Sequence, residues 1–147
     1  MEIKQRLIER CRELLLETEN NLKSVIDDAQ KAANEYGLPR DRYDSFRTQL
    51  LRKRDMFAQQ LAKNNEQLNL LEKIDPDKKL SRVEFGALVI TEYQKLFISI
   101  SLGKMSIDGE EYYAISAAVP VYKAMEHKKA GEEFIFHGKK NKIISIS

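Results

Sequence analysis

The sequence is poor in the residues that build cross-linked or metal-bound folds. Its 147 residues include one cysteine, two histidines and no tryptophan. A single cysteine excludes a disulfide framework and a zinc site built on several cysteines. Cys11 lies in an amphipathic stretch, where a small buried apolar side chain is the expected role, and its solitude fits a reducing compartment.

Long apolar runs and an excess of one charge are also missing. The longest apolar stretch near the N-terminus is residues 14–16, which is far too short for a membrane span or a signal-peptide core. We therefore expect a cytoplasmic protein with no membrane partner. The chain has 25 basic and 23 acidic residues, a formal charge of +2, so binding to nucleic acid requires a local basic patch.

Motifs of independent catalysis are absent from the sequence. His127 and His137 have neither cysteine partners nor metal-ligand spacing, and solvated side chains are the simpler interpretation. There is no glycine-rich nucleotide loop and no nucleophile-elbow motif. The sequence thus favours a protein that is not itself an enzyme, has no small-molecule substrate and binds no cofactor on its own.

Glycine and proline divide the chain into two parts of different texture. Residues 1–75 contain only Gly37 and Pro39 as helix breakers, whereas the other five glycines follow Asp75. We place a domain boundary there, with an N-terminal domain at residues 1–75 and a C-terminal domain at 76–147. The first part carries 14 basic and 14 acidic residues and the second 11 and 9, so neither is a polycation.

Apolar residues of the first part recur at spacings of three and four, as on one face of a long helix. One stripe runs from Leu7 to Tyr36 and a second from Tyr43 to Leu71. Helices of roughly 30 residues, about 45 Å long, bury such stripes by packing against each other as an antiparallel coiled-coil hairpin. Polar Arg54 and Asn64 interrupt the second stripe, and we interpret them as residues that specify register.

The second part is built from short β-rich segments separated by turn signals. Residues 119–125 instead predict one short helix with Pro120 in its first turn. The predicted fold class is α+β: an N-terminal antiparallel α-helical coiled-coil hairpin, then a small antiparallel β-sheet domain with one short helix. The predicted strands are residues 83–90, 95–100, 111–116, 133–136 and 142–146.

The hairpin turn carries two carboxylates, Asp41 and Asp44, which we expect on one face at the start of the second helix. One interpretation is structural, because aspartate near a helix start caps free amides and complements the helix dipole. The other is that the pair holds a hard divalent cation together with a second macromolecule and water.

Basic residues surround and follow these carboxylates. They would bind phosphates if the hairpin entered a cavity filled with nucleic acid, whereas a solvated helix face is the simpler interpretation. The candidate phosphate-contacting residues are Arg40, Arg42, Arg47, Arg52, Lys53 and Arg54.

Several segments resemble the bacterial Gre transcript cleavage factors. The sequence Val-Glu-Phe-Gly-Ala-Leu-Val at residues 83–89 is similar to the first strand of the Gre C-terminal domain, and residues 40–45 are similar to the tip of a Gre-like subgroup. The usual Gre tip is absent, and the family's serine before the proline is Val119 here. Further residues similar to the family pattern are Ile115, Ser116, Pro120, Ala124, Lys128 and Gly131.

The resemblance implies an FKBP-like C-terminal domain that docks at the rim of the RNA polymerase secondary channel, with the hairpin inserted toward the active centre. Asp41 and Asp44 would share Mg²⁺ with the polymerase, only in the complex, and the polymerase would cleave backtracked RNA. Nascent RNA is the implied nucleic-acid partner, and DNA of the elongation complex is a further candidate. The implied docking residues are Ala118, Val119, Pro120 and Val121.

Three alternatives remain open at this point. A Gre-like regulator or inhibitor could enter the same channel without stimulating cleavage. An FKBP-like domain could be an active prolyl isomerase, although the sequence shows no signature of an aromatic-lined pocket. The hairpin could also be a plain oligomerisation module, in which case its seam would continue between chains.

Overall fold

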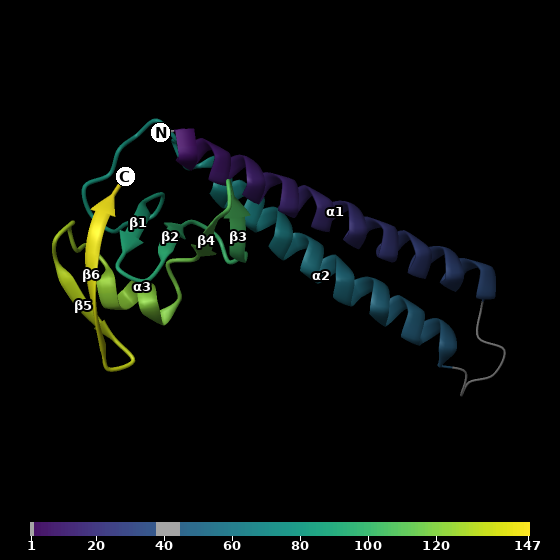
Figure 1. The fold of residues 1–147 in the computed structure, drawn as a ribbon. Helices are drawn as coiled ribbons and strands as arrows, with labels where there is room; N and C mark the ends of the chain where they lie inside the picture. Colours follow the sequence, from purple (N-terminus) through teal and green to yellow (C-terminus); the bar gives the residue numbers. More distant parts are fainter. Residues whose placement is uncertain (1, 38–44) are drawn as a thin grey trace. The chain divides into compact units, whose positions relative to one another are not determined.

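The computed structural model describes residues 2–37 and 45–147 (Figure 1). None of the described helices is both long and apolar enough to cross a membrane. The elements in chain order are α1 (Glu2–Tyr36), α2 (Phe46–Glu72), β1 (Leu88–Thr91), β2 (Lys95–Ile98), β3 (Gly103–Ile107), β4 (Glu110–Ile115), α3 (Pro120–Met125), β5 (Glu133–Phe136) and β6 (Lys139–Ile146).

The chain forms two compact units. The hairpin unit is residues 13–68, and the sheet unit is residues 1–12 together with 69–147. The first turns of α1 and the last turn of α2 therefore belong with the sheet unit, although composition alone divides the chain after residue 75.

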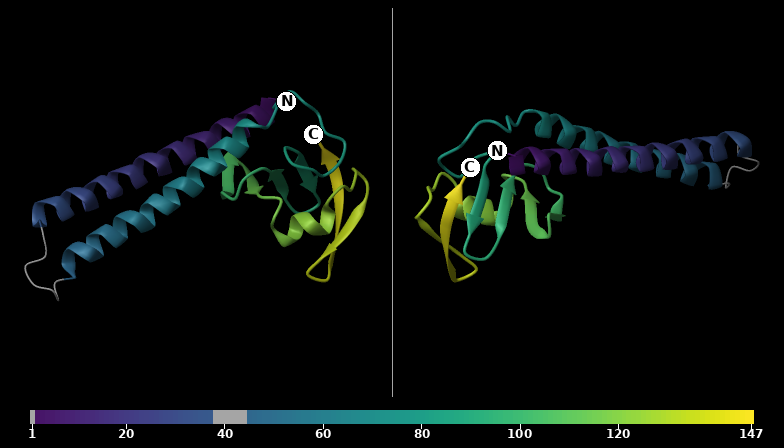
Figure 2. Two further views of the ribbon diagram at one scale, coloured as in Figure 1. Left: turned by 180° about the vertical axis from the view of Figure 1, so that it is seen from behind. Right: turned by 45° about the horizontal axis from the view of Figure 1, so that its top comes forward.

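Within the hairpin unit, α1 and α2 run side by side in opposite directions in both views of Figure 2. On α1, Leu15, Leu22 and Ala29 are buried at intervals of seven residues, the repeat of a two-helix seam. On α2, Leu50 and Phe57 keep the same interval and are half-buried. The predicted helical hairpin is confirmed.

Polar side chains also occupy this seam and bridge the two helices. The buried Asn64 donates from Nδ2 to the backbone oxygen of Leu15 at 2.9 Å. Nearer the hairpin turn, Arg54 Nη1 donates to Gln30 Oε1 at 2.6 Å. Because each bond is made only in one alignment of the helices, these contacts support the interpretation that the polar positions specify register.

The sheet unit contains six strands in the order β3-β4-β2-β1-β6-β5. The predicted α+β class, with a helical hairpin followed by a sheet and one short helix, is confirmed. The sheet is mixed rather than wholly antiparallel, because β2 and β4 pair in parallel, with Leu96 opposite Tyr113. β2 and β4 run in the same direction because the chain reverses in β3, a strand that was not predicted, and reverses again in β4. In the sheet, β4 lies between β2 and β3.

The turn between β3 and β4 shows why this hairpin forms. Asp108 and Gly109 have φ values of 53° and 79°, the left-handed conformations that a two-residue hairpin turn requires. Met105 and Ile107 of β3 are buried, while Lys104 and Ser106 are exposed. This alternation places one face of the strand against the core.

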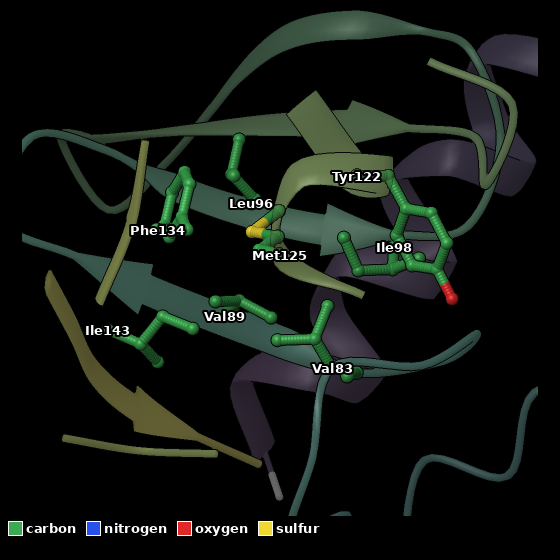
Figure 3. Close-up of a cluster of buried hydrophobic side chains, with 9 residues drawn as sticks. Val83, Val89, Leu96, Ile98, Tyr122, Met125, Phe134 and Ile143 are labelled. Carbon is green, nitrogen blue, oxygen red and sulfur yellow. The ribbon is translucent and has the colours of Figure 1, made fainter. Parts of the chain in front are cut away.

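The core of the sheet unit is a cluster between the sheet and α3 (Figure 3). Val83 and Ala87 belong to it. Residues 83–87 do not form the start of a strand as predicted, because Val83 exchanges backbone hydrogen bonds with His127 and Lys128 after α3. The cluster comprises Val83, Ala87, Val89, Leu96, Ile98, Tyr122, Met125, Phe134 and Ile143.

Candidate functional site

The tip residues predicted to hold a metal or phosphates, Arg40, Asp41, Arg42 and Asp44, lie outside the described residues. The rings of Tyr36 and Phe46 are 4.8 Å apart between centroids, so the chain enters and leaves the segment at neighbouring points. Within residues 2–37 and 45–147, no group of three metal-ligating side chains is placed to hold an ion.

The basic residues of α2 divide into two kinds. Arg54 is engaged, because its Nε donates to Asp55 Oδ1 at 2.9 Å in addition to the contact with Gln30. Arg52 and Lys53 are exposed, and neither forms an ion pair with another described residue. Of the described candidate residues, Arg52 and Lys53 are therefore the two that are exposed and make no ion pair.

Arg47 is the second residue of α2 and is half-buried. Its Nε is buried without a hydrogen-bond partner among the described residues. A buried guanidinium N–H is unfavourable without an acceptor, and the described residues supply none to Arg47 Nε.

The predicted docking segment opens α3. Ala118 and Pro120 are exposed, whereas Val119 and Val121 are half-buried. Pro120 occupies the first helical position, where its missing N–H is not needed. Val119 is the N-cap and makes no side-chain hydrogen bond, so this position has apolar surface where a serine would cap the helix.

A groove of about 290 Å³ adjoins this segment. Val121 lines it together with Phe134 and Phe136 of β5 and Tyr93 of the β1–β2 turn. Lys139 Nζ lies 3.8 Å from the centroid of the Tyr93 ring, which places a cation on an aromatic wall. This aromatic groove could not be predicted from the sequence, because its walls come from segments that are distant in the chain and share no spacing.

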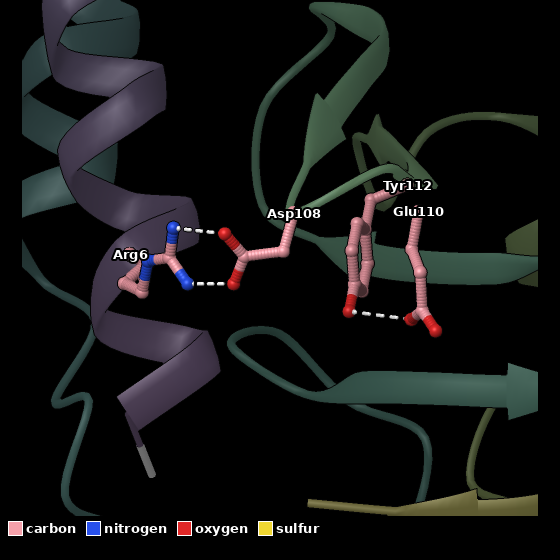
Figure 4. A network of polar contacts seen from close by, with 4 residues as sticks. All are labelled: Arg6, Asp108, Glu110 and Tyr112. Atoms are coloured by element: carbon pink, nitrogen blue, oxygen red, sulfur yellow. Dashed lines mark hydrogen bonds and ion pairs between the residues drawn. The ribbon is translucent and has the colours of Figure 1, made fainter.

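A polar network ties the start of α1 to the β3–β4 turn within the sheet unit (Figure 4). Both Arg6 terminal nitrogens donate to the two carboxylate oxygens of Asp108, one of them at 2.8 Å. This bidentate contact lowers the pKa of the Asp108 carboxyl below its ordinary value. The Glu110 carboxylate beside it accepts from Lys95 and from the Tyr112 hydroxyl, and the hydrogen bond from Lys95 lowers the pKa of Glu110.

Comparisons with known proteins find similarity among solved structures. No protein-family model matches the chain, and no curated protein matches it. The chain is similar to the crystal structure of GreA factor homolog 1 (Gfh1) protein of Thermus thermophilus, with 16% sequence identity and a TM-score of 0.35, over 95% of this chain and 94% of that chain. A similarity at this level does not establish a shared function.

Proposed function

We propose that the chain is a Gre-like transcription elongation factor that binds RNA polymerase at the secondary channel and stimulates cleavage of backtracked RNA. It is not itself an enzyme, since the polymerase performs the hydrolysis. Its proposed contribution is charge placed at the polymerase active centre by the tip of the hairpin.

The observation that carries the proposal is where the Gre-like residues fall in the fold. Gly86 has a φ of 92° and donates to Ile98 O at 2.7 Å, and Gly131 has a φ of 91° and donates to Ile143 O at 2.7 Å. Pro120 starts α3. The glycines and the proline that resemble the Gre pattern thus lie where the backbone conformation favours those residue types. The helical hairpin precedes them in the chain, as in the Gre factors.

In this proposal the two carboxylates of the tip help hold a Mg²⁺ ion. A pair of carboxylates leaves most of the octahedral shell of Mg²⁺ to water, so the free protein should bind it weakly and the polymerase must complete the site. There, Asp41 and Asp44 would supply negative charge at a fixed position, and the ion would activate water and stabilise the leaving oxygen. Arg52 and Lys53 would contact phosphates along the path of the hairpin.

The cleavage assay uses backtracked elongation complexes assembled with the host polymerase. The parent chain should shorten the RNA, and Asp41→Asn with Asp44→Asn should reduce cleavage by orders of magnitude while leaving the fold intact, because asparagine also caps helices. Full cleavage by the double variant would exclude the metal role. Binding without cleavage by the parent would instead favour a channel regulator or inhibitor.

Docking is tested separately through the start of α3. Pro120→Asp should weaken polymerase binding because it places a charge in the apolar contact, while an acidic residue is well tolerated in the first turn of a helix. Ser106→Asp, on the exposed face of β3, is the matched control. Equal binding by Pro120→Asp and the control in a pull-down titration would show that the contact is misplaced.

A further inference from the structure

The sheet unit contains a second cavity, of about 330 Å³. It shares no lining residue with the groove beside α3, and more of its lining residues are charged. Its walls come from the start of α1 and from the segment that follows α2. Three lysines and two carboxylates contribute to it, and apolar side chains supply the rest. The lining residues are Lys4, Lys73, Ile74, Asp75, Lys78, Leu80, Glu84, Phe85 and Gly86.

Lys4 is the unusual residue of this cavity, because only 2% of it is exposed. Its Nζ donates to the backbone oxygen of Lys78 at 3.0 Å. An ammonium group has three N–H bonds, and the described residues offer Lys4 no second acceptor. A buried ammonium with unused donors is unfavourable unless another acceptor joins it.

The carboxylates of the cavity do not fill this role. Asp75 Oδ1 accepts from the backbone N–H of Asp77 at 2.9 Å, and Glu84 lies 3.6 Å from Arg82 Nε. Neither is within ion-pair distance of Lys4. The lining therefore has more cations than free anions.

We propose that this cavity binds a small phosphate-bearing anion, with Lys4 as the buried donor and Lys73 and Lys78 as additional cations. Lysine binds phosphate as a point charge, and the tetrahedral group offers enough oxygens for several ammonium groups at once. The volume suits a small ligand rather than a polymer segment. This proposal does not depend on polymerase binding. It concerns binding of the anion alone, and the anion is not proposed to be a substrate.

The electrostatics of the site make binding depend on pH. Burial lowers the pKa of Lys4 below 10.5, and the nearby Asp75 opposes that shift. Bound phosphate stabilises the charged amine, so it should raise the pKa of Lys4. The affinity for phosphate should therefore fall as the pH rises through the pKa that Lys4 has in the unliganded protein. The other charged groups that line the cavity with Lys4 are Lys73, Lys78 and Glu84.

The test follows the Lys4 side-chain NMR signals of the full chain during titration with phosphate, pyrophosphate and a nucleoside monophosphate at constant ionic strength. We expect a saturable shift and a raised Lys4 pKa. Preference for pyrophosphate or phosphate would identify a free anion, whereas preference for the monophosphate would identify a nucleotide.

Two variants locate the binding, which is measured by calorimetry. Lys4→Met keeps an apolar stem and should abolish binding, and Lys78→Gln keeps the backbone acceptor and should weaken it about tenfold, as expected for one lost charged contact. Lys63→Met, on an exposed position of α2, is the control and should bind as the parent does. If Lys4→Met is unfolded, the parent titration and Lys78→Gln decide the question.

The proposal is overturned if no saturable shift of the Lys4 signals occurs. It is equally overturned if Lys78→Gln binds with unchanged affinity and Lys4→Met retains binding, since the anion would then lie elsewhere on the surface.

Discussion

The sheet unit and the hairpin unit are built on different principles. The sheet unit has an apolar cluster in which Val83, Val89 and Ile98 have no exposed surface. The seam of the hairpin unit combines small residues such as Ala29 and Ala33 with the polar Asn64. The sheet unit is therefore stabilised mainly by burial of apolar surface. The hairpin unit instead uses part of its helix–helix interface to fix the alignment of the two helices.

This difference has consequences for motion. Long helices with few fully buried contacts open locally at lower free energy than strands that pack on a continuous core. We therefore expect amide hydrogens of the hairpin unit to exchange faster than those of the sheet core.

The largest expected effect comes from a matched pair of leucines. Leu96 is 2% exposed in the sheet core, and Leu61 is half-buried in the hairpin. Leu96→Ala should lower the free energy of unfolding by about 3 kcal/mol, and Leu61→Ala by about 1 kcal/mol, because the cavity left in a close-packed core is larger. Urea unfolding followed by circular dichroism measures both, and equal losses would remove the distinction between the units.

A smaller effect is expected from removing the buried amide of the seam. Asn64→Leu should raise stability by about 1 kcal/mol while relaxing the alignment of the helices, because an apolar seam accepts more than one register. Spin labels at Ser24→Cys and Gln59→Cys report this alignment. Burial raises the pKa of Cys11 to about 12, so the introduced cysteines should be labelled preferentially.

The label distance should be single and narrow with Asn64 and broad with Asn64→Leu. A narrow distance in both proteins would show that the apolar residues alone set the register. Ultracentrifugation of the same two proteins also tests the oligomerisation alternative, which requires a stable dimer with the hairpin tip buried.

The smallest expected effect concerns the ion pair between the first turns of α1 and the end of α2. Arg12 Nε lies 2.8 Å from Glu72 Oε1, and the two side chains are 38% and 56% exposed. Because solvent screens the pair, Glu72→Gln should lower stability at neutral pH by only about 0.5 kcal/mol. Glu17→Gln, at an exposed position of α1, is the control.

The pH dependence of this effect has a defined sign. The hydrogen bond from Arg12 lowers the pKa of Glu72 below 4.5. Its stabilising contribution should be complete above that ordinary value and disappear as the pH falls through the lowered pKa. A difference between parent and Glu72→Gln that persists at strongly acidic pH would contradict the electrostatic explanation.

The extent to which the fold was predictable depends on how local each signal is. The helical hairpin could be predicted from two long apolar stripes and from the helix breakers Gly37 and Pro39. These signals depend on residues that are only a few positions apart in the sequence. Strand β3 was not predicted because its short alternation lies between Gly103 and Asp108, residue types that favour turns. The parallel pairing of β2 with β4 depends on contacts between distant segments, which no local pattern specifies.

The candidate sites show the same limit. Pro120 was placed correctly at the start of a helix because its ring fixes the backbone there. The aromatic groove beside Val121 and the cavity around Lys4 were missed, since each is assembled from separate segments. In the sequence Lys4 is one of many charged residues on a long helix, and only the fold buries it.

The most direct test of the proposed function is a photoreactive residue at Lys53, an exposed position on α2. The labelled chain is bound to a backtracked elongation complex of its host polymerase and irradiated. We predict crosslinks to the polymerase around its secondary channel or to the nascent RNA, and their loss with Pro120→Asp. Crosslinks solely between copies of the chain, or the same polymerase crosslinks with Pro120→Asp, would contradict a hairpin inserted by docking through the start of α3.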